Sequence, residues 1–286
     1  MKYTYLALVA VIAFAACQPS KKEETAEIKI PSLTLKWETD TVLTTCESVI
    51  YDSANEVLYV SNINGTPTDK DGNGFIAKLG LDGKIVQAQW VSGMDAPKGM
   101  GIYNGKLFVS DINRIHEIDI AAGNIINTYV VDSAQFLNDI TIDANGKVYV
   151  SDSNVGNILV LENGVVSEYV SGVAGVNGLL SEGTDLQMVS FATGVFNTID
   201  VNKQVTLKTD SIDAGDGIVA LSEGGYLVSS WTGKVTYVSP EWKNSLLLDT
   251  SAESINAADI EYIAEKRLLL VPTFFKNKVV AYEVSQ

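Results

Sequence analysis

One arrangement of apolar and polar residues recurs six times from residue 47 onward. Each copy has a short apolar stretch, a turn, and a second stretch of β-branched or aromatic residues that in five copies ends in Val-Ser. Successive copies start 51, 40, 39, 39 and 42 residues apart, at Glu47, Lys98, Asn138, Asn177, Asp216 and Ala258. Two further strand-like runs lie between copies, and Asn-Gly or Asp-Gly pairs mark several turns, as β-hairpins require.

The sixfold period predicts an all-β protein, a six-bladed β-propeller. Propeller blades are four-stranded sheets that repeat about every 40 residues around a central channel. No segment shows the 3.6-residue apolar stripe of an amphipathic helix, so we expect few helices. Only three strand candidates follow Ala258, and we expect the N-terminal stretch Ser32–Trp37 to supply the fourth strand and close the last blade. A β-sandwich, the competing all-β fold, does not explain a regular period.

The first residues are typical of an export signal. Residues 1–16 contain one lysine and then an apolar run that is too short to span a membrane and ends in small residues, as in a secretory signal peptide. Small residues directly before Cys17 resemble the bacterial lipobox, in which the cysteine is acylated. An ordinary signal peptide that happens to end in cysteine is the alternative.

This signal defines the predicted organisation of the chain. We predict a lipoprotein signal peptide at residues 1–16, a flexible tether at 17–29 and the six-bladed β-propeller at 30–286. Such a protein is lipid-anchored at the bacterial cell envelope, on the periplasmic face or at the outer membrane. It touches the membrane only through the N-terminal lipid on Cys17.

Composition narrows the partners. The 286 residues include 20 basic and 35 acidic side chains, for a formal charge of −15. Nucleic-acid-binding proteins need a basic face that displaces counterions, so we expect no nucleic-acid partner. If Cys17 carries lipid, Cys46 has no disulfide partner and is expected to be a small buried residue. We expect a monomer whose ligand is neutral, cationic or a metal ion.

The predicted ring brings a set of polar residues to its axis. The first strand of each blade lines the central channel, so the first residues of the six copies should converge. Glu47, Asn138, Asn177 and Asp216 would then place carboxylate and amide oxygens at one buried point, which requires a cation. Oxygen ligands of this kind suit Ca²⁺ better than Zn²⁺. The alternative is that the ammonium group of Lys98 pairs with Glu47 or Asp216 and replaces the metal.

Four short motifs carry a family resemblance. They are Glu47-Ser-Val-Ile-Tyr51, Asn138-Asp139, Asn177-Gly178-Leu179 and Asp216-Gly217, in this order in blades one, three, four and five. At these residues the chain resembles the senescence-marker-protein/gluconolactonase (regucalcin-like) family of six-bladed propellers, over the whole mature ring. The resemblance implies that the four side chains hold a divalent cation, Ca²⁺ by their chemistry. Sugar-lactone hydrolases of the family have an arginine where this chain has Phe136.

The ends of the second strands border the same mouth of the channel. These positions are Asn62, Asp111, Asp152, Phe191, Trp231 and Phe274. We expect Asp111 and Asp152 to hydrogen-bond their own following loops, as aspartates at such positions commonly do. The aromatic residues are better pocket candidates. The predicted substrate pocket comprises Lys98, Phe136, Phe191, Trp231 and Phe274.

Two other signals carry less weight. The stretch 69–76 resembles a calcium-binding EF-hand loop, but the position of the essential glutamate is Gly80 and no helix flanks it, so we expect a long loop in blade one. His116 is the one histidine, and we expect it at the surface or at a strand edge.

Two functions are consistent with these features. The first is a metal-dependent hydrolase of a lactone or similar ester, in which Asp216 is both a metal ligand and the general base. The second is a non-catalytic propeller of the NHL-repeat kind that binds a peptide, a glycan or a protein. The fold alone does not separate them, because propellers host many unrelated functions.

Overall fold

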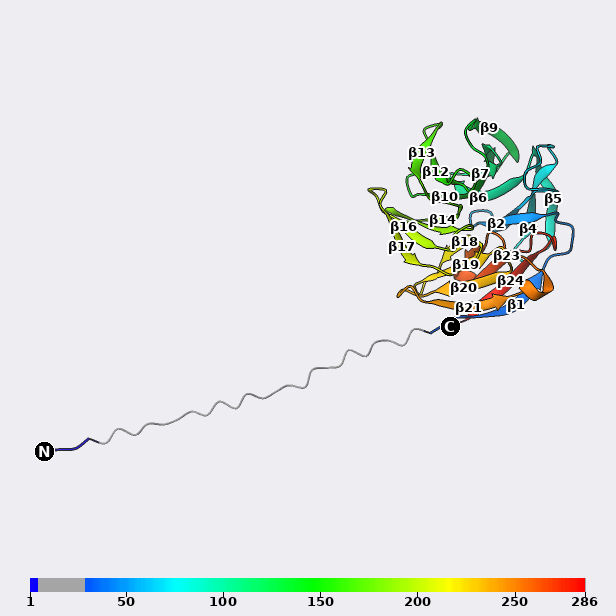
Figure 1. The fold of residues 1–286 in the computed structure, drawn as a ribbon. Helices are drawn as coiled ribbons and strands as arrows, with labels where there is room; N and C mark the ends of the chain where they lie inside the picture. Colours follow the sequence, from blue (N-terminus) through cyan, green and yellow to red (C-terminus); the bar gives the residue numbers. More distant parts are fainter. Residues whose placement is uncertain (5–28, 286) are drawn as a thin grey trace.

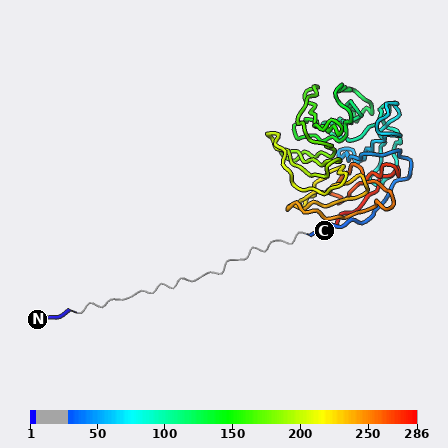
Figure 2. The backbone as a smooth tube through the Cα atoms, in the orientation of Figure 1, coloured from blue at the N-terminus to red at the C-terminus, as the bar shows by residue number. Residues whose placement is uncertain are grey.

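Six four-stranded sheets form a ring around a central channel in the computed structural model, which describes residues 1–4 and 29–285 (Figure 1). Most of the predicted signal peptide, Cys17 and most of the predicted tether lie outside the described residues. The backbone trace passes through the sheets in chain order (Figure 2). The prediction of an all-β, six-bladed propeller is therefore confirmed.

In blades one to five, the strands run from the channel outward in chain order. Blade one contains β2 (Cys46–Asp52), β3 (Val57–Asn62), β4 (Gly74–Gly80) and β5 (Ile85–Met94). Blade two contains β6 (Pro97–Tyr103), β7 (Lys106–Asp111), β8 (Arg114–Asp119) and β9 (Asn124–Val130). Blade three contains β10 (Leu137–Ile142), β11 (Val148–Asp152), β12 (Asn157–Glu162) and β13 (Val165–Ser171).

The second half of the ring repeats this arrangement. Blade four contains β14 (Val176–Glu182), β15 (Asp185–Ser190), β16 (Phe196–Ile199) and β17 (Val205–Thr209). Blade five contains β18 (Gly215–Ala220), β19 (Tyr226–Ser230), β20 (Lys234–Val238) and β21 (Asn244–Asp249). Blade six contains β22 (Glu261–Ile263), β23 (Leu268–Pro272), β24 (Val279–Ser285) and β1 (Ser32–Glu38).

The N-terminal strand closes the ring, as the sequence predicts. β1 pairs antiparallel with β24, so that Ser32 lies opposite Ser285 and Glu38 lies opposite Val280. This pairing joins the two ends of the folded chain in one sheet and covers the edge that β24 would otherwise expose. Two 3-10 turns, η1 (Ser251–Glu253) and η2 (Ala264–Lys266), are the helical elements of the described residues, and no described helix is long and apolar enough to cross a membrane.

Burial decreases from the inner strands of a blade to its outermost strand. All five residues of β11 are buried because blades two and four cover its two faces, whereas the outermost strand β9 has residues that are mostly exposed. The core consists of apolar clusters between neighbouring blades. In one of them, Ile158 of blade three packs with Leu179 and Met188 of blade four.

The recurring serine of the Val-Ser pairs fastens neighbouring inner strands. The Ser229 hydroxyl accepts the backbone N–H of Gly217 at 2.8 Å and donates to the carbonyl of Ala258, at the start of the next blade, at 2.6 Å. Ser110 donates in the same way to the carbonyl of Asn138. Ser151 accepts the N–H of Asp139 at 2.9 Å. These bonds fix the beginning of the inner strands, where the candidate site lies.

Candidate functional site

Five inner strands carry a β-bulge at the same place, and each bulge holds a predicted axis residue. The pairing register between the first and second strands shifts across Cys46/Val49, Pro97/Met100, Leu137/Ile140, Val176/Leu179 and Gly215/Ile218. The first residue in each bulge is Glu47, Lys98, Asn138, Asn177 or Asp216. A bulge releases its residues from ladder pairing and redirects their side chains, which allows these five to face the channel mouth.

Glycine at the second bulge position allows the inner strands to approach one another closely. A Cβ atom on Gly99 would lie 2.5 Å from the Asp139 Cα, and one on Gly217 would lie 2.5 Å from the N–H nitrogen of Ile260. A Cβ on Gly178 would collide with the Asp216 carbonyl. In Asn177-Gly178 and Asp216-Gly217, a predicted cation ligand is therefore followed by a position that only glycine can occupy without a clash.

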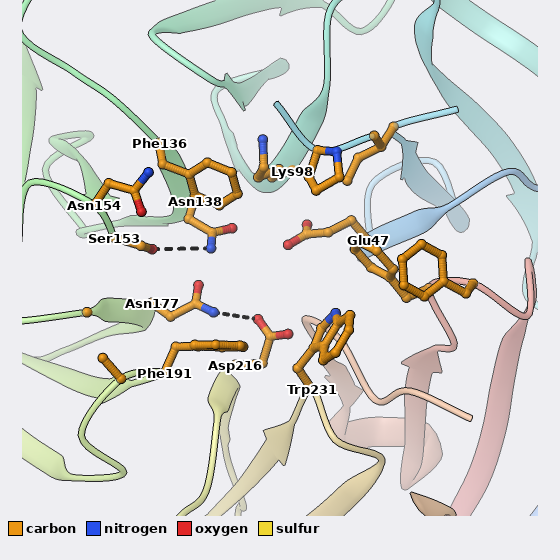
Figure 3. A pocket seen from close by; sticks show the side chains of 16 residues that line it. Glu47, Lys98, Phe136, Asn138, Ser153, Asn154, Asn177, Phe191, Asp216 and Trp231 are labelled. Carbon is orange, nitrogen blue, oxygen red and sulfur yellow. Dashed lines mark hydrogen bonds between the residues drawn. The ribbon is translucent and has the colours of Figure 1, made fainter. Parts of the chain in front are cut away.

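The five bulge residues form the polar floor of a cavity of about 500 Å³ at one end of the channel. Its wall contains all four predicted aromatic residues, Phe136, Phe191, Trp231 and Phe274. Figure 3 shows Glu47, Asn138, Asn177 and Asp216 pointing toward a common space. The structure thus brings together every predicted metal-site and pocket residue.

Ala258 and Phe275 differ from the predicted arrangement. Ala258, the first residue of the sixth copy, does not line this cavity and is buried in an apolar cluster with Ile63 and Phe274. Phe275 lines the cavity but was not predicted, and its place directly after Phe274 was the available signal.

Three oxygens on the cavity floor are buried without a hydrogen-bond partner among residues 1–4 and 29–285. They are Oε2 of Glu47 and the side-chain oxygens of Asn138 and Asn177. The two amide nitrogens are used elsewhere: Asn138 Nδ2 donates to the Ser153 hydroxyl at 3.3 Å, and Asn177 Nδ2 donates to Asp216 Oδ1 at 2.9 Å. Both amides consequently turn their oxygens toward the common space (Figure 3). Buried acceptors of this kind are costly unless a ligand satisfies them, so the residues fit a cation.

The electrostatics of the floor also favour a positive ligand. Burial raises the pKa of Glu47 well above its ordinary value, and the neighbouring charge of Asp216 raises it further. Burial likewise raises the pKa of Asp216, with a further contribution from Asp259. A bound cation would reverse both effects by stabilising the ionised carboxylates.

Any cation here needs amide ligands in addition to carboxylates. Within residues 1–4 and 29–285, no three His, Cys, Asp or Glu side chains are grouped closely enough to hold a metal ion. Two carboxylates and two amide oxygens remain a donor set of the kind that Ca²⁺ accepts.

Lys98 does not form the ion pair that would replace a metal. Its ammonium nitrogen donates to the Ala96 carbonyl at 2.9 Å and lies 4.5 Å from the centre of the Phe136 ring. No ion pair shorter than 4.0 Å joins it to Glu47 or Asp216 among the described residues. Burial lowers the pKa of Lys98 to about 8. In Figure 3 the ammonium group points away from the Glu47 carboxylate.

The polar residues at the ends of the second strands support loops and leave the cavity wall to the aromatic residues. Asp152 accepts the N–H groups of Asn154 and Val155 in its following loop, as predicted, and also that of Phe136 at 3.1 Å. Asp111 differs from the prediction: it accepts the N–H groups of Asp95 and Ala96, in the connection that precedes its blade.

Asn62 and Cys46 are buried near the start of β2. Asn62 accepts the N–H of Thr44 at 2.9 Å and does not line the cavity. Cys46 is fully buried, as expected, and burial raises the pKa of its thiol to about 12. The thiolate is therefore not accessible for chemistry at neutral pH.

The prediction for His116 was wrong. The side chain is 3% exposed and lies within blade two. Its Nε2 lies 3.0 Å from Asp111 Oδ2, and its Nδ1 lies 3.0 Å from the Thr128 hydroxyl. A histidine with two polar partners can be buried at little cost. It does not line the cavity.

A second acidic layer lies deeper in the channel and was not predicted. Asp139 and Asp259 line a separate cavity of about 400 Å³ at the other end. Burial raises the pKa of Asp139 well above its ordinary value and that of Asp259 to about 6. The Ser48 hydroxyl donates to Asp259 Oδ2 at 2.6 Å. The signal for this layer was the second position of the bulge pairs, which Ser48 and Asp139 occupy.

Solved structures of other six-bladed propellers share this fold. A gluconolactonase from Xanthomonas campestris has a TM-score of 0.67 at 13% identity, over 85% of this chain and 86% of that chain. A putative gluconolactonase has a TM-score of 0.66 at 13% identity, over 89% and 92% of the two chains. Virginiamycin B lyase from Staphylococcus aureus, a catalytically inactive histidine-to-alanine variant with quinupristin, has a TM-score of 0.62 at 14% identity, over 89% and 99%.

Sequence comparison adds nothing to this likeness. No protein-family model and no curated protein matches the chain. At 13–14% identity the solved structures establish a shared propeller fold and not an activity.

Proposed function

We propose that the protein is a metal-dependent hydrolase of a lactone or ester, similar to the gluconolactonases, with Ca²⁺ held by Glu47, Asn138, Asn177 and Asp216. The observation that carries the proposal is the set of three buried, unpartnered oxygens on the cavity floor. The aromatic cavity directly above them gives a substrate access to that floor. The shared fold of the two gluconolactonase structures is consistent with this activity.

The chain's own residues account for the remaining chemistry. When bound, a divalent cation polarises a substrate carbonyl and lowers the pKa of water. Asp216 is the proposed general base, since Asn177 holds its Oδ1 and no described residue donates a hydrogen bond to its Oδ2. Lys98 lines the cavity and can donate a hydrogen bond to the oxygen of the leaving group. The aromatic wall excludes water from the reacting atoms and strengthens these interactions.

A ligand-binding propeller without catalysis is the second candidate. Its specific support is Phe136, which stands where sugar-lactone hydrolases of the resembling family have arginine, so the catalytic pocket of those enzymes is not reproduced. Such a protein would bind a peptide, a glycan or a protein at the same mouth. A lyase activity has less support, because the lyase with this fold is inactive as a histidine variant, whereas His116 lies outside the cavity.

Two measurements separate hydrolase from binding module. The melting temperature of the purified chain, with and without millimolar Ca²⁺, tests the cation, because a ligand that binds only the folded state raises it. Asn138→Ala and Asn177→Ala should remove most of the increase, and an Asn154→Ala control should keep it. Turnover of aryl esters and lactones, compared with an Asp216→Ala variant, then tests catalysis. A stabilising cation without turnover would favour the binding module.

We also propose that the protein is a monomeric lipoprotein of the bacterial cell envelope, anchored through Cys17. The support is the small-residue sequence before this cysteine and the polar tether that follows it. Metabolic labelling with a fatty-acid analogue in a bacterial host should label the wild-type chain and leave Cys17→Ser unlabelled. Labelling of both chains, or of neither, would contradict the anchor.

A further inference from the structure

The cavity wall is a connected aromatic cluster drawn from three blades. Trp231 is its centre, with ring centroids 6.4 Å from Phe191, 5.6 Å from Phe274 and 6.0 Å from Phe275. All three contacts are edge-to-face, the geometry that aromatic pairs prefer, and Phe274 and Phe275 pack against each other at 4.7 Å. The wall is therefore a firm apolar surface built before any ligand arrives.

The rim of this wall leaves large apolar side chains in solvent. Phe191 is 45% exposed and Phe275 is 58% exposed. A ligand that covered them would gain about 25 cal/mol for each Å² of apolar surface removed from water. Phe136, Ile63 and Pro67 continue the apolar lining beyond the aromatic cluster.

Few polar groups in the cavity remain free to bind substrate hydroxyls. Beyond the four proposed cation ligands, the polar lining residues are Lys98, Ser153 and Asn154. Ser153 already accepts the Asn138 amide, and Lys98 already gives one of its three N–H groups to the Ala96 carbonyl and has no acceptor to offer a hydroxyl. A sugar lactone would bury more hydroxyls than these three side chains can pair, and each unpaired group costs about 1–3 kcal/mol.

We propose that the substrate is a compact, apolar ester or lactone that carries an aromatic or short aliphatic group, and not a polyhydroxylated sugar lactone. The inference rests on the proposed hydrolase function. The reacting carbonyl lies against the polar floor, and the apolar group lies against Trp231, Phe191 and Phe275. A cavity of about 500 Å³ has the size of a small-molecule site, which excludes a large polymer.

The first test is a preference ratio. The Ca²⁺-loaded chain should hydrolyse dihydrocoumarin or phenyl acetate with a kcat/KM at least about tenfold higher than that for D-glucono-1,5-lactone, since one well-placed apolar contact is worth about 10–200-fold. Trp231→Ala should lower kcat/KM for dihydrocoumarin about 10- to 100-fold and change that for γ-butyrolactone, which does not reach the wall, only a few-fold. The matched control is Trp242→Ala, whose ring packs on Phe196 and Tyr226 outside the cavity.

The second test does not need turnover. The lactam analogue of dihydrocoumarin cannot be hydrolysed readily, and its binding should quench Trp231 fluorescence, with the quench lost in Trp231→Phe and retained in Trp242→Phe. If kcat/KM were higher for gluconolactone than for dihydrocoumarin and phenyl acetate, the proposed substrate class would be overturned, but the proposed hydrolase function would stand. Turnover of none of the substrates would overturn the hydrolase. In that case, lactam binding that depends on Trp231 would still support an apolar ligand in this cavity. A lack of such binding would refute an apolar ligand as well.

Discussion

The two ends of the central channel use similar acidic residues in different ways. At the aromatic end, Glu47 Oε2 and the oxygens of Asn138 and Asn177 are buried without partners. At the opposite end, Asp139 accepts the N–H groups of Ile140 and Leu179, each at 2.6 Å. Asp259 accepts the Ser48 hydroxyl. The first set therefore has unused hydrogen-bonding capacity, and the second set holds the inner strands of neighbouring blades together.

This difference shows which property identifies a candidate site. Burial raises the pKa of Glu47, Asp216 and Asp139 well above ordinary carboxyl values, so a perturbed pKa does not separate the two ends. Hydrogen-bond satisfaction does separate them, because a buried acceptor without a donor is destabilising until a ligand supplies one. The aromatic end is the one that needs a ligand.

The largest expected effect comes from replacing the proposed base. Asp216→Asn preserves the shape of the side chain and its bond from Asn177, and removes the group that accepts the proton. With Ca²⁺ present, kcat for an aryl ester should fall about 100- to 10,000-fold, the usual contribution of a general base. Asp139→Asn is the control at the opposite end and should change kcat less than tenfold. Retention of a tenth of the activity by Asp216→Asn would contradict the proposed role.

The next effect concerns stability at the opposite end of the channel. Asp139→Ala removes the acceptor of two buried N–H groups, and each buried donor left without a partner costs about 1–3 kcal/mol. We expect the free energy of unfolding to fall by about 3 kcal/mol or more in urea denaturation without Ca²⁺. Asn138→Ala, at the aromatic end, should cost less, because its oxygen has no partner to lose. A larger loss of unfolding free energy for Asn138→Ala than for Asp139→Ala would contradict the structural role assigned to the Asp139 end and the ligand-binding role assigned to the aromatic end.

The sequence predicted the ring and the floor of the cavity because both depend on a repeated position. The same bulge recurs in five blades, so aligning the copies at Glu47 and Asp216 also aligns the residues that converge. It did not predict Asp259 or the burial of His116. Those depend on contacts between particular side chains: Asp259 accepts the Ser48 hydroxyl of blade one, and His116 lies between Asp111 and Thr128 on the two strands beside it in blade two. Such contacts join elements whose spacing follows no period.

The pH dependence of stability should distinguish the cation-free and cation-bound proteins. Folding raises the pKa of Glu47 and Asp216, and that of Asp259 to about 6, so the folded state binds more protons than the unfolded state above about pH 4. Without Ca²⁺, the free energy of unfolding should therefore decrease as pH rises from about 4 through 6 and beyond. Saturating Ca²⁺ should flatten this decrease, and Glu47→Gln should reduce the flattening. Identical pH profiles with and without Ca²⁺ would argue against a cation at the floor.

The smallest effect tests whether Lys98 competes with a cation. Its charge lowers the pKa of Glu47, so the ammonium group acts on the floor although it forms no ion pair there. Lys98→Met keeps the apolar stem and removes the charge, and calorimetric titration should show Ca²⁺ binding about fivefold more tightly, equivalent to about 1 kcal/mol. Lys208→Met is the matched control, because Lys208 also lies over an aromatic ring, that of Trp242 at 5.3 Å, outside the cavity.

The alternative role of Lys98 leads to the opposite result in the cation-free protein. If the ammonium group replaced a metal, Lys98→Met would leave Glu47 and Asp216 without a counter-charge, and removal of one partner of a buried pair costs about 3–5 kcal/mol. The observed position of Lys98 predicts a loss of unfolding free energy well below about 3–5 kcal/mol. The substitution would break only one hydrogen bond to Ala96 and one contact with Phe136. Urea denaturation of Lys98→Met without Ca²⁺ therefore decides whether Lys98 only weakens cation binding at the floor or takes the place of the cation.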